Sequence, residues 1–142
     1  MRSPMLTLGV VLLWAVLVAA SDPPRYAVAS SGPEADAEIS PQAARAPFIL
    51  IFDHEGRLTE VIEERDLPGR SAGPQTALLL REREVTHFIA KEFGPNLVRA
   101  LDQAAIRHVQ RQGPAQEAVL ALIEEMGGGG DGHGAARRSA TR

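Results

Sequence analysis

The stretch FILIFDHEGRLTEVIE, residues 48–63, decides the fold of this chain. Its first five residues form an uninterrupted apolar run, which is typical of a strand covered on both faces. Residues 53–56 contain turn-forming side chains and end in glycine, so residues 58–63 are expected to return as the second arm of a hairpin. Alternation along this arm predicts two faces, with Leu58, Glu60 and Ile62 on one and Thr59, Val61 and Glu63 on the other.

The segments on either side of the hairpin alternate between strand and helix patterns. Strands are predicted at residues 26–29, 86–90 and 106–110, and helices at residues 75–84, from Pro95 onward, and from Gly113-Pro114 to Met126. The expected inner faces of the helices are Ala77, Leu78 and Leu80 or Arg81 in the first, Leu97, Val98, Leu101, Ala104 and Ala105 in the second, and Ala118, Val119, Leu122, Ile123 and Met126 in the third. A hairpin followed by such units predicts an α/β fold, with one mixed five-stranded sheet and helices on its faces.

The composition fits one small domain and excludes several functions. The chain has 142 residues, 44% hydrophobic but only 4% aromatic, so its core must be aliphatic. Its formal net charge is −3 and Lys91 is its only lysine, a balance that excludes nucleic acid as a partner because no basic stripe is present. Cysteine is absent, which excludes disulfides, thiolate metal ligands and cysteine nucleophiles.

Residues 1–20 have the pattern of a secretory signal. A positive start at Arg2 precedes an apolar run that ends in small residues before Ser21. The run is shorter than the roughly 20 residues of a membrane-spanning helix. We therefore predict export to the periplasm, the alternatives being an uncleaved membrane anchor or a cytoplasmic protein with a misassigned start. Residues 21–25 then form a linker, residues 26–126 the domain, and residues 127–142 a disordered, Gly-rich basic tail.

Strand polarity predicts where a ligand would bind. The first strand and the two that follow helices should run in parallel, so that the loops after them gather at one edge, which the residues before Phe48 join. Small residues there let a ligand approach backbone N–H groups, and the helix that begins at Pro95 directs its positive end to the same place. The candidate residues for an anionic ligand are Ser31, Gly32, Arg45, Ser71, Gly73, Lys91, Gly94 and Asn96.

A series of short motifs resembles one known family. The motifs are AVASSG at residues 27–32, ISP at 39–41, RAPF at 45–48, GPN at 94–96 and RAL at 99–101. In this order and spacing they resemble the small domain of the dinitrogenase iron–molybdenum cofactor biosynthesis proteins, the type found in NifX, NafY and the C-terminal part of NifB. The resemblance covers about residues 26–126.

The resemblance implies a single three-layer ribonuclease-H-like domain and a non-catalytic role as a carrier. It implies iron–molybdenum cofactor or an iron–sulfur precursor as the cargo, with a protein partner as a further possibility. The membrane would be contacted only through the N-terminal segment, if that segment is uncleaved. His108, in the last predicted strand, is the candidate metal ligand, since no spaced pair of histidines is present.

The sequence leaves two alternatives to a carrier open. Relatives carry Phe-Gly-Arg and Gly-Gly-Ala-Gly where this chain has Ala43-Ala44-Arg45 and Arg70-Ser71-Ala72-Gly73. Loss of these glycines favours a degenerate member that acts as a protein-interaction module without a ligand. A hydrolase using Ser31 is the other alternative, but no recognisable triad accompanies that serine, and no phosphate-binding loop or set of carboxylates suggests another enzyme.

Overall fold

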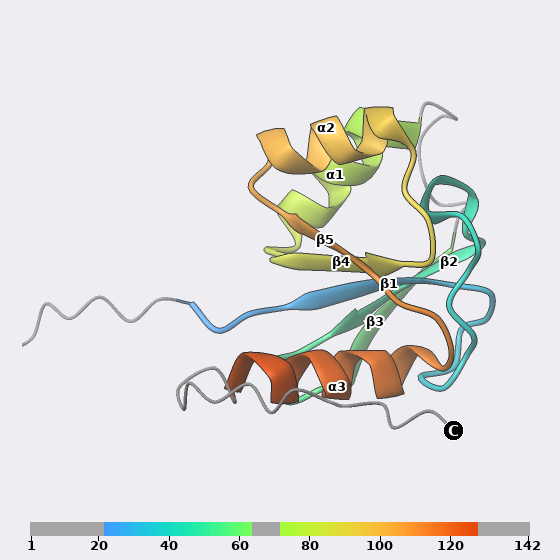
Figure 1. Ribbon diagram of the computed structural model, residues 1–142, viewed down its shortest axis with the longest axis vertical. Coiled ribbons are helices and arrows are strands. Elements are labelled where there is room, and N and C mark those ends of the chain that lie inside the picture. Colours follow the sequence, from blue (N-terminus) through green and yellow to red (C-terminus); the bar gives the residue numbers. More distant parts are fainter. Residues whose placement is uncertain (1–21, 64–71, 128–142) are drawn as a thin grey trace, which may run out of the picture.

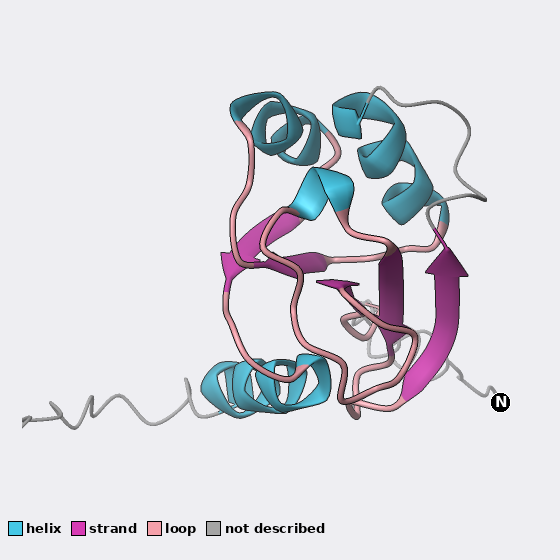
Figure 2. Ribbon diagram, turned by 90° about the vertical axis from the view of Figure 1, so that its right-hand side faces the viewer, coloured by secondary structure: helices cyan, strands magenta, loops and turns pink. Residues whose placement is uncertain are grey.

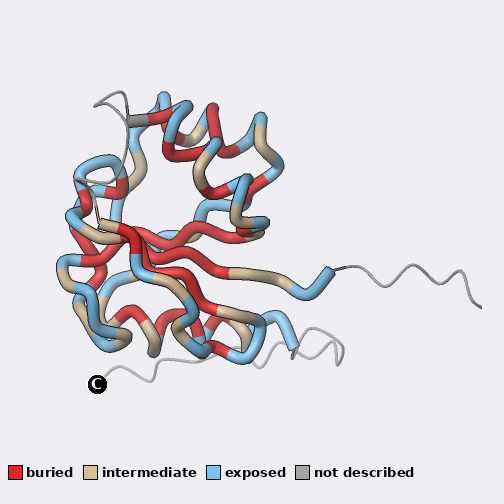
Figure 3. The backbone as a smooth tube through the Cα atoms, turned by 180° about the vertical axis from the view of Figure 1, so that it is seen from behind, coloured by how far each residue is buried: buried red, intermediate tan, exposed pale blue. Residues whose placement is uncertain are grey.

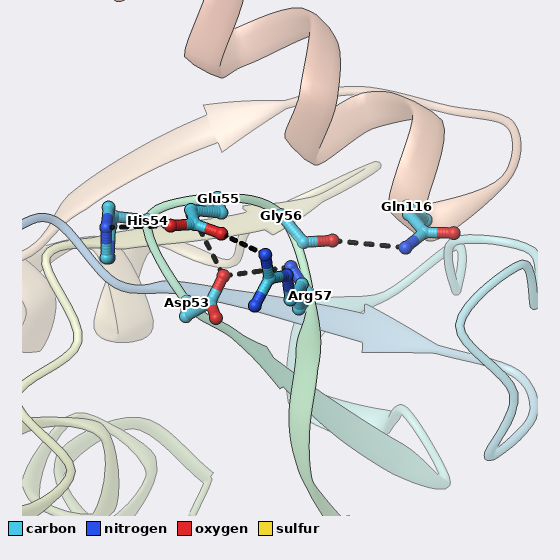
Figure 4. Close-up of polar contacts among 6 residues, drawn as sticks. All are labelled: Asp53, His54, Glu55, Gly56, Arg57 and Gln116. Atoms are coloured by element: carbon cyan, nitrogen blue, oxygen red, sulfur yellow. Dashed lines mark hydrogen bonds and ion pairs between the residues drawn. The ribbon is translucent and has the colours of Figure 1, made fainter.

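The predicted hairpin is present with the predicted bounds. The computed structural model describes residues 22–63 and 72–127, in which β2 is Phe48–Phe52 and β3 is Leu58–Glu63. Asp53 shapes the turn between them, because its Oδ1 accepts the N–H groups of Arg57 and Glu55, both at 2.9 Å (Figure 4). These two bonds hold the pKa of the Asp53 carboxyl below its usual value, and the bond from Arg57 has the larger effect.

The other elements follow the predicted order. They are β1 (Tyr26–Ser30), the short 3-10 helix η2 (Ala43–Arg45), α1 (Ala72–Glu82), β4 (His87–Ala90), α2 (Pro95–Gln103), β5 (Arg107–Gln110) and α3 (Ala115–Gly127). The five strands form one sheet in the order β3-β2-β1-β4-β5. β1, β4 and β5 are parallel, and β2 is antiparallel to both β1 and β3. This arrangement confirms the predicted mixed α/β sheet.

The sheet is the middle of three layers. Figure 1 shows α1 and α2 on one face and α3 on the other. Alternation along β2 divides its residues between two cores, since Ile49 and Ile51 pack with α1 and α2, whereas Leu50 and Phe52 pack with α3. The central strands are buried along their length (Figure 3). The prediction that residues 48–52 are covered on both faces is therefore confirmed.

The predicted faces of β3 are wrong at its start. Ile51 pairs with Glu60 and Phe52 pairs with Leu58, so Thr59 is an extra residue in a β-bulge. The bulge turns Leu58 to the α3 core while Ile62 remains in the core beneath α1 and α2. Leu58 and Ile62 thus lie on opposite faces, because the extra residue breaks the period of two.

Two predicted helix faces also need correction. α1 begins three residues before the predicted position. Its buried face consists of Gly73, Thr76, Ala77 and Leu80. Leu78 and Arg81, which were predicted to face inward, are exposed, Leu78 by 55%. In α2, Ala105 lies beyond the helix end and is exposed; in α3, Met126 is 45% exposed. The remaining predicted positions of these helices are buried or partly buried.

The ends of the chain fall outside the described part. The predicted signal at residues 1–20 and the tail after Gly127 lie there, as does Ser71. Among the residues that the structure describes, no helix is both long and apolar enough to span a membrane.

Candidate functional site

The predicted ligand edge is formed where the parallel strands end. β1, β4 and β5 run in the same direction, and β2 begins where β1 ends, with Ser30 paired to Phe48. Figure 2 looks onto this edge, and shows η2 between the α1–α2 pair and the ends of the strands. The loops that strand direction assigned to one edge therefore lie at that edge. They form two halves, which differ in how their hydrogen-bond donors are used.

The half that contains Ser31 and Gly32 is closed on itself. The Ser31 N–H and hydroxyl both donate to the Glu38 carbonyl, at 2.9 and 3.1 Å, and the Ser30 hydroxyl donates to the Gly32 carbonyl at 2.7 Å. The same loop caps α3, whose N–H groups at Ala115 and Gln116 donate to the carbonyls of Ala37 and Ala35, at 2.8 and 2.9 Å. The N–H and hydroxyl of Ser31 and the hydroxyl of Ser30 are thus already occupied by the protein.

The other half is built from two adjoining helix starts. A Cβ added to Gly73, in the first turn of α1, would lie 3.2 Å from the Asn96 carbonyl oxygen and 3.4 Å from the Leu97 nitrogen. No side chain caps α2 at Gly94, and in the described residues the N–H groups of Asn96 and Leu97 have no hydrogen-bond partner. The positive ends of two helices thus meet at one place.

The two predicted cations flank these helix starts. η2, which was not predicted, packs against α1 and is tied to the loop before α2 by a 3.0 Å hydrogen bond from the Ala43 N–H to the Glu92 carbonyl. Ala43 is buried, and Arg45 at the end of η2 is exposed. Lys91 follows β4 directly and is also exposed. We call the group Arg45, Gly73, Lys91, Gly94 and Asn96 the helix-start edge.

His108 lies on the face of the sheet that α2 covers. It pairs in register with Phe88, and its ring lies 5.3 Å from that of Phe93, which is in turn 5.7 Å from Phe88. His108 is exposed and lines an open hollow of about 490 Å³ with Asp102, Ala105, Ile106 and Arg107. Within the described ranges no three His, Asp or Glu side chains are placed to share a metal ion, so the structure brings no such set to His108.

The donor set suits an anion better than a bare metal. Exposed guanidinium and ammonium groups beside unpaired backbone N–H groups attract negative charge. Iron–sulfur clusters are usually held by cysteine thiolates, and the sequence contains no cysteine. A cluster would therefore fit this edge through its own anionic ligands, and not through bonds from the protein to its metal ions.

Comparison with known proteins places the chain in a family. Residues 24–125 match the family described as Dinitrogenase iron-molybdenum cofactor. The chain belongs to this family. The match covers nearly all of the domain that the sequence motifs predicted, and it confirms the resemblance inferred from them. No curated protein matches the sequence.

Solved structures support the same fold. The NMR structure of a Thermotoga protein, described as NifB and placed in the DUF35 family, is 29% identical with a TM-score of 0.60, covering 71% of this chain and 88% of that one. The apo form of the orange protein from Desulfovibrio gigas is 24% identical with a TM-score of 0.66, covering 75% and 92%. A protein from Methanococcus jannaschii, described as a dinitrogenase, is 12% identical with a TM-score of 0.53, covering 73% and 90%.

Sequence reasoning missed two parts of this site. It did not predict η2, although Ala43-Ala44-Arg45 consists of good helix formers and follows the Ser40-Pro41 pair. It also did not predict that the loop after β1 would use its own donors. That closure depends on a carbonyl seven residues away along the loop and on the start of α3, which no local pattern encodes.

Proposed function

We propose that this protein is a non-catalytic carrier that binds an anionic metal cluster, or a related small anion, at the helix-start edge. The observation that carries the proposal is the close approach of the α1 and α2 starts at Gly73 and Asn96, in a chain of the cofactor family. Iron–molybdenum cofactor or its iron–sulfur precursor is the proposed cargo.

Each residue of the helix-start edge has a distinct role in this proposal. Arg45 supplies positive charge from the end of η2, and Lys91 supplies it from the loop before α2. Gly73 lets the starts of α1 and α2 approach each other, and Gly94 leaves the backbone accessible, since a Cβ there would meet no atom within 4 Å. The N–H groups of Asn96 and Leu97 donate to the anion in the direction that the α2 dipole favours. Ser31 then supports the edge without contacting the ligand, since its N–H and hydroxyl are both bonded to the Glu38 carbonyl.

The chemistry of the edge supports carriage and not catalysis. The Ser31 hydroxyl donates to a backbone carbonyl, so no base is placed to activate it as a nucleophile. Ribonuclease-H-like nucleases require carboxylates gathered around two metal ions. The described residues contain no such group, and β1 presents Ala29 and Ser30 at its end.

A metal-binding assay tests the proposal. Anaerobically purified protein is mixed with isolated iron–molybdenum cofactor, passed through a gel-filtration column and analysed for iron and molybdenum. Co-elution is expected, and Arg45→Ala or Lys91→Ala should weaken binding about tenfold, as for the loss of one charge-assisted hydrogen bond of about 1.5 kcal/mol. Arg81→Ala is the matched control, because Arg81 is an exposed arginine in the last turn of α1.

The second candidate function is a protein-interaction module without a ligand. The closed loop around Ser31, Gly32 and Glu38 favours it, since the Ser31 donors that the sequence assigned to the ligand are bonded within the loop. Clean separation of the protein from the cofactor, with the Arg45 and Lys91 variants indistinguishable from the parent, would exclude the carrier and leave this candidate.

We also propose that the protein is exported. The support is the pattern of residues 1–20, an apolar run between a positive start and small residues. In that case the cargo would be handled outside the cytoplasm, in the periplasm.

A further inference from the structure

A buried histidine packs against the tyrosine that contacts the end of α3. His87, the first residue of β4, is 8% exposed, and its ring centroid lies 5.3 Å from that of Tyr26. The Tyr26 hydroxyl contacts Sδ of Met126, in the last turn of α3, at 3.6 Å. Tyr26, His87 and Met126 thus form a continuous group between strand and helix, which we call the α3 latch.

The surroundings of His87 favour a neutral ring. Its polar contact is between Nδ1 and the hydroxyl oxygen of Thr86, at 2.7 Å, and none of the ion pairs among the described residues involves it. Arg107 is its neighbour in register on β5. Burial lowers the pKa of His87, and the positive charge of Arg107 lowers it further.

The other titratable groups near the latch do not offset this effect. From β1, Tyr26 is neutral, and burial raises its pKa further. From the last turn of α3, Glu125 is paired with Arg111 at 2.6 Å, and Glu124 is exposed to solvent. Protonated His87 would therefore be a partly dehydrated cation beside a second cation, without a paired carboxylate.

The two ends of α3 are held unequally. At its start, two backbone N–H groups donate to the loop after β1, and Nε2 of Gln116 donates to the Gly56 carbonyl at 3.1 Å. At its end, the polar contacts that join the described residues to the rest of the protein are the weak Tyr26–Met126 contact and the Arg111–Glu125 pair, and the apolar packing of Leu122 and Ile123 stops just before the last turn. Weakly held helix ends open locally at lower free energy than the rest of the domain.

We propose that the α3 latch is an acid-sensitive device, in which protonation of His87 releases the last turn of α3 while its first turn stays docked. While the last turn of α3 is docked, the imidazole of His87 must stay neutral. When that turn is released, water can solvate the charged ring. Since an exposed histidine titrates near about pH 6.5, the latch is closed above that value and is released progressively below it. This device is independent of the proposed cargo.

Amide hydrogen exchange on the full-length protein tests the latch. Protection factors, corrected for intrinsic exchange, are measured by NMR at about pH 7.5 and about pH 5, on the two sides of the ordinary histidine pKa. Amides of residues 124–127 should lose protection several-fold at the lower pH, while those of residues 118–120 keep theirs. Titration of the His87 ring protons in the same samples gives its pKa directly.

Two pairs of variants separate the latch from general acid sensitivity. His87→Asn should abolish the acid-induced loss, whereas His54→Asn, on the exposed hairpin turn, should leave it intact. Arg107→Gln keeps the buried histidine but removes its neighbouring charge, so the pKa of His87 should rise and the loss should shrink. Arg99→Gln, an exposed arginine on α2, is its control.

Three results would overturn the proposal. One is equal loss of protection at both ends of α3, which would indicate global unfolding. Another is an unchanged loss in His87→Asn. The third, which applies even if His87→Asn fails to fold, is an Arg107→Gln protein in which neither the His87 pKa nor the acid-induced loss differs from the parent.

Discussion

Gly56 occupies the most demanding backbone position in the hairpin turn. Its φ is +83°, a region that residues with a Cβ adopt at a cost. A Cβ there would also lie 2.6 Å from Cδ2 of Leu120 on α3. The glycine therefore serves the turn and the docking of the turn against α3 at the same time (Figure 4).

Gly56→Ala should destabilise the protein by about 1–2 kcal/mol, mainly the cost of left-handed backbone, because the clashing Leu120 atom is the end of a half-exposed side chain that can move. Urea unfolding measures this. Adding Leu120→Ala should restore part of the loss by removing the clash, at little cost of its own because Leu120 is 47% exposed. Gly94→Ala is the control, with φ −73° and open space around its Cβ, and should change stability by less than about 0.5 kcal/mol. A Gly56→Ala protein as stable as the parent would contradict this account of the turn.

Helices α1 and α2 end in the same way, and neither uses glycine. After α2, Ala105 takes φ +59°, and the N–H of Ile106 donates to the Leu101 carbonyl at 2.9 Å. After α1, Glu84 takes φ +59°, and the N–H of Val85 donates to the Leu80 carbonyl at 3.0 Å. Both are left-handed helix ends, at which glycine is the usual residue.

Ala105→Gly should therefore stabilise the protein by about 0.5–1 kcal/mol, because the relief of left-handed strain exceeds the added entropy of the unfolded chain. Thermal or urea unfolding measures the gain. Ala104→Gly is the comparison, since Ala104 has φ −88° and gains nothing from glycine. Equal effects of the two substitutions would show that backbone strain at position 105 is unimportant.

At the scale of the whole molecule, one edge of the sheet combines two different constructions. In the loop after β1 the donors of Ser31 are bonded within the loop, which also caps α3, whereas the starts of α1 and α2 adjoin with unpaired N–H groups of Asn96 and Leu97 in the described residues. The edge is thus closed on the α3 side and open on the side of the helix pair. The carrier proposed above would therefore bind its ligand at the α1 and α2 starts and not on the α3 side.

The predicted export of the protein decides in which compartment it would bind a ligand. If residues 1–20 are a cleaved signal, the mature protein recovered from cells should begin at Ser21. Mass spectrometry of the intact protein in the periplasmic fraction measures this. Recovery of the uncleaved chain in the membrane fraction would support an anchor instead, and recovery in the cytoplasm would support a misassigned start.

The sequence by itself determined the order of the elements, the hairpin and the direction of every strand. These follow from local patterns: the apolar run of β2, the turn residues after it, and proline at the start of α2. They also suffice to predict the edge at which the helix starts gather, because strand direction places the loops. The family resemblance followed from short motifs in and beside these elements, such as AVASSG at the end of β1 and GPN at the start of α2.

Only the tertiary structure decided which residues of that edge are open. The extra residue Thr59 turned Leu58 to the other core, and the bond from Ser31 to Glu38 closed one half of the edge. Packing against Phe93 held His108 on the α2 face, and the Gly73–Asn96 approach created the open half. Each of these depends on contacts between atoms whose positions the completed sheet and its helices fix. The period and propensity of a single segment contain no information about such contacts.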